Sequence, residues 1–446
     1  MKKHLPVVFF LVCLVFVNSS LTDARALDPL SPFIPYEMSV LPNGMRIIVK
    51  EIPAYPIAAV NMWVGVGAKD DPHQLSGMAH FFEHLLFKGT TNRPVGQIAR
   101  DVEALGGYIN AMTNYDFTTY FIVVPSDQAM FAMEIQADAI RNSSFVQAEI
   151  DKERNVIFEE IRVQEDNPTS KLVNLVLQSL LAETAYARPV LGSVEDLNNI
   201  NRTEIVAFHK DHYVPNNMTL VVVGDVKAAD IMVAARSLYG DMESKSQIQP
   251  RHVTVPSLTE ILRLTEERQV DQAYGLMAFP GPSGNRDAMA LSVAGILLGA
   301  GQSSRLFREL MMESRMVTEI GANYDQLMEV GLLAISFSAP PENIEQIEEA
   351  LVEQIKRLRT EPVTEEELEK AQSMARASFA FAAESNVQLA LVLGQYETFG
   401  GVKTVVNWVD VLESITPEDI LRAAQEYLNP DGYVWGQIVP KGGSSQ

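Results

Sequence analysis

Residues 77–89 read GMAHFFEHLLFKG, and this stretch determines most of what the 446-residue chain can be. Its pattern predicts a helix from Gly77 to Lys88. Ser76 is the expected N-cap, because a serine oxygen can accept hydrogen bonds from the first amides of a helix, and Gly89 is the expected stop. Most of the other side chains are apolar, so we expect this helix to pack in a protein core.

Two histidines and a glutamate interrupt that apolar surface. His80 and His84 are four residues apart, so both imidazoles face the same way on a helix, and Glu83 continues the stripe. Burying such groups without partners costs free energy, and a bound metal ion provides a partner. The alternative is a pair of core histidines beside a glutamate, but with 7 histidines in the chain this spacing rarely arises by chance. The chain has one cysteine, which excludes a thiolate zinc cluster and leaves histidine and carboxylate as ligands.

A catalytic zinc ion needs three protein ligands and an open position, so the third ligand must come from another element. A second predicted helix, 149–164, carries Glu153, Glu159 and Glu160. Glu153 and Glu160 are seven residues apart and share a face, while Glu159 points about 100° away from Glu160. Two acidic groups on one face suit a metal ligand and a second carboxylate that supports the site. A solvated acidic face would explain the same residues equally well.

The chain divides into two halves of similar plan. Strands are predicted at 61–66, 118–124, 219–224, 273–279, 332–339 and 433–439, and further helices at 127–141, 343–359 and 364–393. A polar segment with prolines, 246–256, is the expected linker between an N-terminal domain, 27–245, and a C-terminal domain, 257–446. Because strands and helices do not strictly alternate, we expect α+β domains that arose by internal duplication.

The N-terminus has the pattern of a secretory signal peptide. Two lysines precede an apolar run at 5–17, which is 13 residues long and therefore shorter than the roughly 20 residues of a membrane-spanning helix. Ala-Arg-Ala at 24–26 fits a cleavage site before Leu27. The sequence thus predicts a signal peptide, 1–26, and a periplasmic or secreted protein; an earlier cut near Ser19 and an uncleaved anchor are the alternatives.

Composition narrows the possible partners. Lys and Arg number 35 against 57 Asp and Glu, for a formal net charge of −22. Such an acidic surface disfavours nucleic acid and anionic membranes. No further segment is long and apolar enough for us to expect a membrane span after signal cleavage.

Three stretches together resemble the pitrilysin/insulinase family of zinc peptidases, the group with an inverted HxxEH motif. They are HFFEHLLFKGT (80–90), GGYINAMTNYDFTTY (106–120) and ERNVIFEE (153–160). The likeness extends over residues 36–440 and is greatest to the short two-domain subgroup, in particular to the zinc-bearing subunit of the mitochondrial processing peptidase. It implies two homologous domains that form half of a clamshell chamber, and a zinc-dependent endopeptidase that cleaves peptides or unfolded segments.

The resemblance also assigns roles to individual residues. It implies that one Zn²⁺ is bound by His80, His84 and Glu160, that Glu83 is the general base, and that Glu153 assists the site without binding the metal. It implies that Asn110, Ala111, Met112 and Thr113 form a substrate-binding edge strand, to which an extended peptide adds as a further strand. Without the resemblance, these four residues would be read as an ordinary edge strand.

The second half lacks these groups and is expected to be inactive. Aligning the two halves places Ala290, Val293 and Ala294 opposite His80, Glu83 and His84, and Ala371 and Ser378 opposite Glu153 and Glu160.

One departure from the family pattern concerns the second domain. The family usually carries an Arg and a Tyr there, seven residues apart, and this chain has Met311 and Thr318 instead, with Arg315 out of register. The resemblance therefore implies a heterodimer in which a homologous inactive chain supplies the Arg and Tyr to hold the substrate. The alternatives are a homodimer that uses other donors and a partner of a different kind. The alternative function is a catalytically silent assembly or binding subunit of the same fold.

Overall fold

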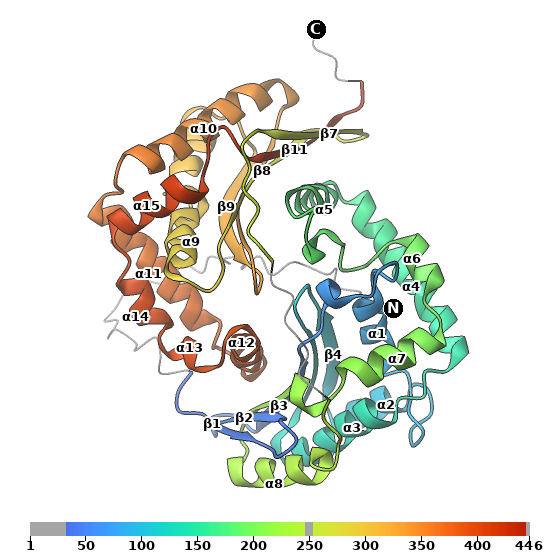
Figure 1. Cartoon of the computed structure of the whole chain (residues 1–446). Helices are drawn as coiled ribbons and strands as arrows, with labels where there is room; N and C mark the ends of the chain where they lie inside the picture. Colours follow the sequence, from blue (N-terminus) through green and yellow to red (C-terminus); the bar gives the residue numbers. More distant parts are fainter. Residues whose placement is uncertain (1–32, 246–252, 443–446) are drawn as a thin grey trace.

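The computed structural model describes residues 33–245 and 253–442. It contains two α+β domains, each built from one mixed sheet covered by helices (Figure 1). The predicted fold class and the division into two domains of common plan are thus confirmed. The predicted signal peptide, 1–26, and most of the predicted linker lie outside the described residues.

The first domain has a six-stranded sheet in the order β1-β2-β6-β3-β5-β4. The strands are β1 (Glu37–Val40), β2 (Arg46–Glu51), β3 (Ile57–Val64), β4 (Tyr108–Thr113), β5 (Thr118–Pro125) and β6 (Met218–Gly224). The helices are α1 (Met78–Leu86), α2 (Gln97–Ala104), α3 (Ala129–Asn142), α4 (Gln147–Asp166), α5 (Pro168–Leu180), α6 (Val194–Asn199), α7 (Arg202–His212) and α8 (Ala228–Tyr239).

The second domain has a five-stranded sheet in the order β7-β11-β8-β10-β9. Its strands are β7 (Leu262–Arg268), β8 (Ala273–Gly281), β9 (Glu319–Gln326), β10 (Gly331–Ala339) and β11 (Val434–Pro440). Its helices are α9 (Arg286–Gly299), α10 (Ile344–Thr360), α11 (Glu365–Phe381), α12 (Asn386–Phe399), α13 (Lys403–Val406), α14 (Trp408–Glu413) and α15 (Pro417–Tyr427).

The two sheets share one topology. Each sheet contains one parallel pair, β2 with β6 in the first and β7 with β11 in the second, and its other pairs are antiparallel. In chain order, each parallel pair joins the first and the last of the five strands that the two sheets share. Strand for strand, β2-β6-β3-β5-β4 corresponds to β7-β11-β8-β10-β9, and β1 is an addition at one edge of the first sheet. The edge strand β4 therefore has its counterpart in β9, and α1 has its counterpart in α9.

Each domain covers the sheet of the other with one of its own helices. Helix α12 of the second domain packs on β3 and β6, and α5 of the first domain packs on β8 and β11 (Figure 1). The α12 contact is close, since a Cβ added at Gly394 would lie 2.1 Å from Nε1 of Trp63. The fully buried Leu389 and Leu393 join Trp63 in one apolar cluster. The contact between α12 and the first sheet is therefore part of a buried hydrophobic cluster that spans both domains.

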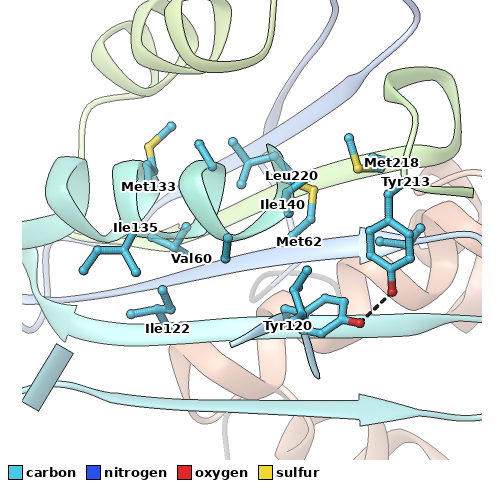
Figure 2. Close-up of a cluster of buried hydrophobic side chains, with 14 of the residues drawn as sticks. Val60, Met62, Tyr120, Ile122, Met133, Ile135, Ile140, Tyr213, Met218 and Leu220 are labelled. Carbon is cyan, nitrogen blue, oxygen red and sulfur yellow. Dashed lines mark hydrogen bonds between the residues drawn. The ribbon is translucent and has the colours of Figure 1, made fainter. Parts of the chain in front are cut away.

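The core of the first domain sets the orientation of α1. Figure 2 shows apolar side chains of β3, β5 and α3 filling the space between sheet and helix, with Tyr120 and Tyr213 joined by a hydrogen bond of 2.6 Å between their hydroxyls. The ring of Phe82 on α1 packs on Tyr213, and the ring of Phe87, the C-cap residue of α1, packs on Tyr120, with centroids 4.3 and 5.5 Å apart. These aromatic contacts hold the apolar face of α1 against the sheet and leave its histidines on another face.

The single helix predicted at 364–393 is wrong. The chain bends by 113° between α11 and α12. The side chain of Ser385 caps the second helix by accepting a hydrogen bond from the amide of Gln388. The bend turns α12 onto the sheet of the other domain, a tertiary contact that local helix propensity does not reveal. Within residues 33–245 and 253–442 no single helix is long and apolar enough to cross a membrane; α11 and α12 meet that test only as this bent pair.

Candidate metal centre

The N-terminus of α1 is capped by a residue from the preceding loop. The buried carboxylate of Asp71 accepts hydrogen bonds from the amides of Gly77 and Ala79, at 2.6 and 2.9 Å. The predicted cap, Ser76, is wrong: the N-cap position is Gly77 in a left-handed conformation, with φ of 92°, and the Ser76 hydroxyl has no partner among the described residues. Burial raises the pKa of Asp71 to about 7, although both amides and the nearby Arg188 stabilise its charged form.

The N-terminal end of α1 packs closely against the segment RPVLG at 188–192. A Cβ at Gly77 would lie 2.7 Å from the carbonyl oxygen of Leu191, so only glycine fits. Arg188 donates hydrogen bonds to the carbonyl oxygens of Asp71 and Lys69, at 2.6 and 2.8 Å. These contacts hold the loop that caps the helix.

The three predicted metal ligands converge. Nε2 of His80 and Nε2 of His84 lie 3.7 and 3.5 Å from the same oxygen, Oε2 of Glu160 on α4. One ligand atom from each residue falls within 4.8 Å of the others. In a tetrahedral zinc site with bonds of ~2.0–2.2 Å, neighbouring ligand atoms lie roughly 3.3–3.5 Å apart. The observed spacing and the donor set of two imidazoles and one carboxylate therefore suit Zn²⁺.

His80 is held in the form that binds metals. Its side chain is buried, and its Nδ1 has no hydrogen-bond partner among the described residues. Burial, together with the neighbouring His84, lowers the pKa of His80 to about 3. The imidazole is thus neutral at physiological pH, with a nitrogen lone pair available for a cation.

His84 is oriented from behind by Glu153. Its Nδ1 lies 3.2 Å from Oε2 of Glu153, whose other oxygen is 2.7 Å from Nζ of Lys88. Burial alone would lower the pKa of His84, but its contacts with Glu153 and Glu160 outweigh burial and raise it to about 9. Burial alone would raise the pKa of Glu153, but the hydrogen bonds to His84 and Lys88 keep it below its usual range. A charged carboxylate behind a metal-binding histidine is the usual arrangement in zinc sites.

Glu83, the predicted base, lies one residue before His84 on α1. The hydroxyl of Thr113 donates a hydrogen bond to Oε2 of Glu83 at 2.5 Å. Burial raises the pKa of the Glu83 carboxyl, against the opposing effects of His84 and Thr113. A glutamate whose pKa is raised is a stronger base than an ordinary carboxylate, which suits a group that accepts a proton from water.

Thr113 is the last residue of β4, the predicted substrate strand. Among the described strands β4 pairs with β5 alone, so its other side is an open edge. Asn110 is exposed, Ala111 and Met112 are half-buried, and Thr113 is buried. The structure therefore brings the end of β4 to Glu83, while the start of the strand faces outward.

The second domain carries nothing comparable at the corresponding positions. Ala290, Val293 and Ala294 of α9 are fully buried in its apolar core. Thr318 donates from its hydroxyl to the carbonyl oxygen of Ser338, at 3.0 Å, and Met311 packs against the core of that domain.

Two supporting residues were not predicted. Lys88 lies just past the end of α1 and follows His84 by four residues, a spacing that could have indicated its contact with Glu153. Asp71 is separated from α1 by a loop, and no local pattern links the two.

Comparisons with known proteins agree with this architecture. Family profiles described as "Insulinase (Peptidase family M16)" and "Peptidase M16 inactive domain" match residues 46–194 and 199–375. An uncharacterized zinc protease of Mycobacterium leprae is 28% identical over 400 residues, which cover 88% of this chain and 89% of the relative. The uncharacterized zinc protease YmxG of Bacillus subtilis is 27% identical over 403 residues, which cover 90% and 97%.

Solved structures share the fold at lower identity. A protease from Helicobacter pylori superposes with a TM-score of 0.85 at 23% identity, over 91% of this chain and all of the other. The first half of the periplasmic protease PqqL of Escherichia coli gives a TM-score of 0.74 at 20% identity, over 91% and 92% of the two chains. From its two matching profiles and its duplicated fold, the chain belongs to the pitrilysin/insulinase family of peptidases, family M16.

Proposed function

We propose that this chain is a zinc-dependent endopeptidase that cleaves peptides or unfolded segments. The observation that carries the proposal is the convergence of His80, His84 and Glu160 at zinc-like spacing, with Glu83 beside them. The names of its curated relatives, zinc proteases, support the same metal and reaction class.

The residues divide the reaction between them. Zinc held by His80, His84 and Glu160 would polarise the scissile carbonyl and lower the pKa of a water molecule. Glu83 takes the proton of the attacking water and passes it to the leaving amine. Glu153 keeps the ring of His84 in its ligating orientation.

The substrate joins the enzyme as a strand. The open edge of β4 offers main-chain groups of Asn110, Ala111 and Met112 to an extended peptide, which would end its pairing near Thr113 and the metal. Folded proteins cannot present such a strand, so peptides and unfolded segments are the preferred substrates.

A second chain of the family is proposed to complete the site. Met311 and Thr318 stand where the family carries an Arg and a Tyr, so the oxyanion lacks these donors within this chain. PqqL supports a two-part arrangement, because this chain matches 47% of its full length. In the proposed heterodimer each chain is half of a clamshell chamber, and the homologous inactive chain brings the Arg and Tyr; a homodimer with other donors is the alternative.

We place this peptidase in the periplasm or outside the cell. The support is the signal-like pattern of residues 1–26, with two lysines, an apolar run of 13 residues and Ala-Arg-Ala before Leu27.

The test is peptide cleavage by the purified chain, alone, with one equivalent of zinc, on a pool of quenched fluorescent peptides. The Glu83→Gln variant is the control, because it keeps the shape of the base and removes its basicity. Zinc-dependent cleavage by the wild type and not by the control supports a complete enzyme. Zinc binding without cleavage directs the search to a sister chain that carries the Arg and Tyr, and to activity on mixing.

Two results would contradict parts of the proposal. A chain that binds no zinc would refute the metal centre. A chain that binds zinc and stays silent with every sister chain of its genome would favour the second candidate, a catalytically silent assembly or binding subunit; Met311 and Thr318 are the observation in its favour.

A further inference from the structure

The hydroxyl of Thr113 has one acceptor at normal hydrogen-bond distance. It lies 2.5 Å from Oε2 of Glu83 and 3.4 Å from the hydroxyl oxygen of Thr118. The Thr118 hydroxyl donates its own proton to the carbonyl oxygen of Val66, at 2.9 Å. The contact between the two threonines is long, so the Thr113 proton goes to Glu83.

Thr113 is itself held firmly. It pairs with Thr118 across the β4–β5 ladder, and both side chains are buried. In the turn that follows, Oδ1 of Asn114 accepts hydrogen bonds from the amides of Asp116 and Phe117, at 2.7 and 3.0 Å. A rigid strand end therefore presents the hydroxyl to the carboxylate.

A glutamate side chain has three rotatable bonds, and a general base must hold its free oxygen toward one water molecule. A charge-assisted hydrogen bond of this length restrains the carboxylate that accepts it.

We propose that Thr113 is a positioning residue, whose hydroxyl orients the carboxylate of Glu83 for proton transfer. The proposal rests on the proposed function and adds to it: β4 binds the peptide along its edge and, through its last side chain, aims the base. Because Thr113 belongs to β4, the position of a peptide bound along β4 is fixed relative to the carboxylate of Glu83. The scissile bond of that peptide would then lie next to the base.

The experiment compares three variants as zinc-loaded proteins, each in the assembly in which the wild type is active. Thr113→Val removes the hydroxyl and keeps the shape and strand preference of the side chain. Thr113→Ser restores the hydroxyl. Thr119→Val is the matched control, because Thr119 is the next buried threonine on β5 and its hydroxyl has no partner among the described residues.

For Thr113→Val we expect kcat to fall about 10- to 100-fold, with KM within about twofold and zinc content unchanged. Thr113→Ser should recover most of the rate, and Thr119→Val should match the wild type. Crystal structures of the zinc-loaded wild type and Thr113→Val should show the Glu83 carboxylate turned away in the variant. A simple loss of stability would lower zinc content and thermal stability in both valine variants and would not be reversed selectively by serine.

The idea is overturned if Thr113→Val keeps the wild-type kcat, or if Glu83 holds the same orientation in both crystal structures. Failure of the proposed function is a separate result: the wild type would then be inactive in every assembly, and the orientation of Glu83 in the two structures would still decide the role of Thr113.

Discussion

Asp116, in the turn between β4 and β5, accepts a hydrogen bond from the backbone amide of Met328, in the turn between β9 and β10, at 2.9 Å. The two residues belong to different domains. The other oxygen of Asp116 accepts from Nζ of Lys69, at 2.7 Å, and from the hydroxyl of Tyr186, at 2.6 Å. Asp116 is 1% exposed, so a single buried carboxylate joins the two domains next to the loop that caps α1.

Replacement of Asp116 by alanine should be strongly destabilising. The change leaves the ammonium of Lys69 buried without its counter-charge, and breaking a buried pair in this way costs about 3–5 kcal/mol. We expect a loss of that size in the free energy of unfolding, measured with denaturant. Asp127→Ala, at an exposed position of the same domain, is the control and should stay within about 0.5 kcal/mol of the wild type. A loss below about 1 kcal/mol for Asp116→Ala would contradict a buried ion pair at this site.

Glu153→Gln should weaken zinc binding without abolishing it. The amide cannot supply the charge that stabilises His84, and loss of such a supporting partner typically costs 10–100-fold in metal affinity. Competition with a zinc chelator measures the change. Glu159→Gln is the matched control, since Glu159 lies on the same helix, is exposed, and pairs with Arg162. Equal zinc affinities for the two variants would show that Glu153 does not support the metal centre.

Glu367 should make stability depend on pH. The hydrogen bonds from Arg305, stronger than the opposing effect of burial, lower the pKa of Glu367 to about 2 in the folded chain, from its ordinary value of 4.5. The folded state therefore favours the charged carboxylate. Its stabilising contribution is fully present above pH 4.5 and is lost as the pH falls toward 2.

Glu367→Gln should accordingly lower the free energy of unfolding at pH 7 by about 1–2 kcal/mol, after allowance for a side chain that is 32% exposed. Urea unfolding of both proteins from pH 7 downward should show this gap closing below pH 4.5. A gap that stays constant down to the acid limit of folding would show that the pair with Arg305 is energetically unimportant.

Gly394→Ala tests the contact between α12 and the first sheet. The added methyl would stand 2.1 Å from Nε1 of Trp63, so either α12 or the indole must move, at a cost of about 1–3 kcal/mol. Thermal unfolding should detect it as a lower midpoint. Gly321→Ala is the comparison, because a Cβ there meets no atom within 4 Å and the backbone is extended. Should both variants melt together, the packing of α12 on Trp63 would be looser than the structure indicates.

Local pattern predicted most of the framework. Strands β5 and β10 are largely apolar and almost entirely buried, and they lie within one residue of their predicted bounds. The spacing of His80 and His84 and that of Glu153 and Glu160 correctly indicated common helix faces. The packing of α4 on α1 determines which carboxylate approaches the histidines. This packing is tertiary structure, which local spacing does not reveal.

The errors have the same origin. Ser76 is a good capping residue by local rules, but Asp71 reaches the helix end from across a loop. The residues between α11 and α12 are compatible with a helix, and the bend depends on the sheet of the other domain. The hydrogen bond from Thr113 to Glu83 joins residues 30 positions apart in sequence, which no periodicity can reveal.

The exchange of α5 and α12 between the domains determines how the chain can be divided. Neither half is self-sufficient: without α12 the first sheet would expose the face that carries Trp63, and without α5 the second sheet would expose the face that carries Leu276. Cutting the chain between residues 245 and 253 should therefore leave two fragments that hold each other as a split protein. Each half of the duplicated chain has thus come to depend on a helix of the other half to cover the apolar face of its own sheet.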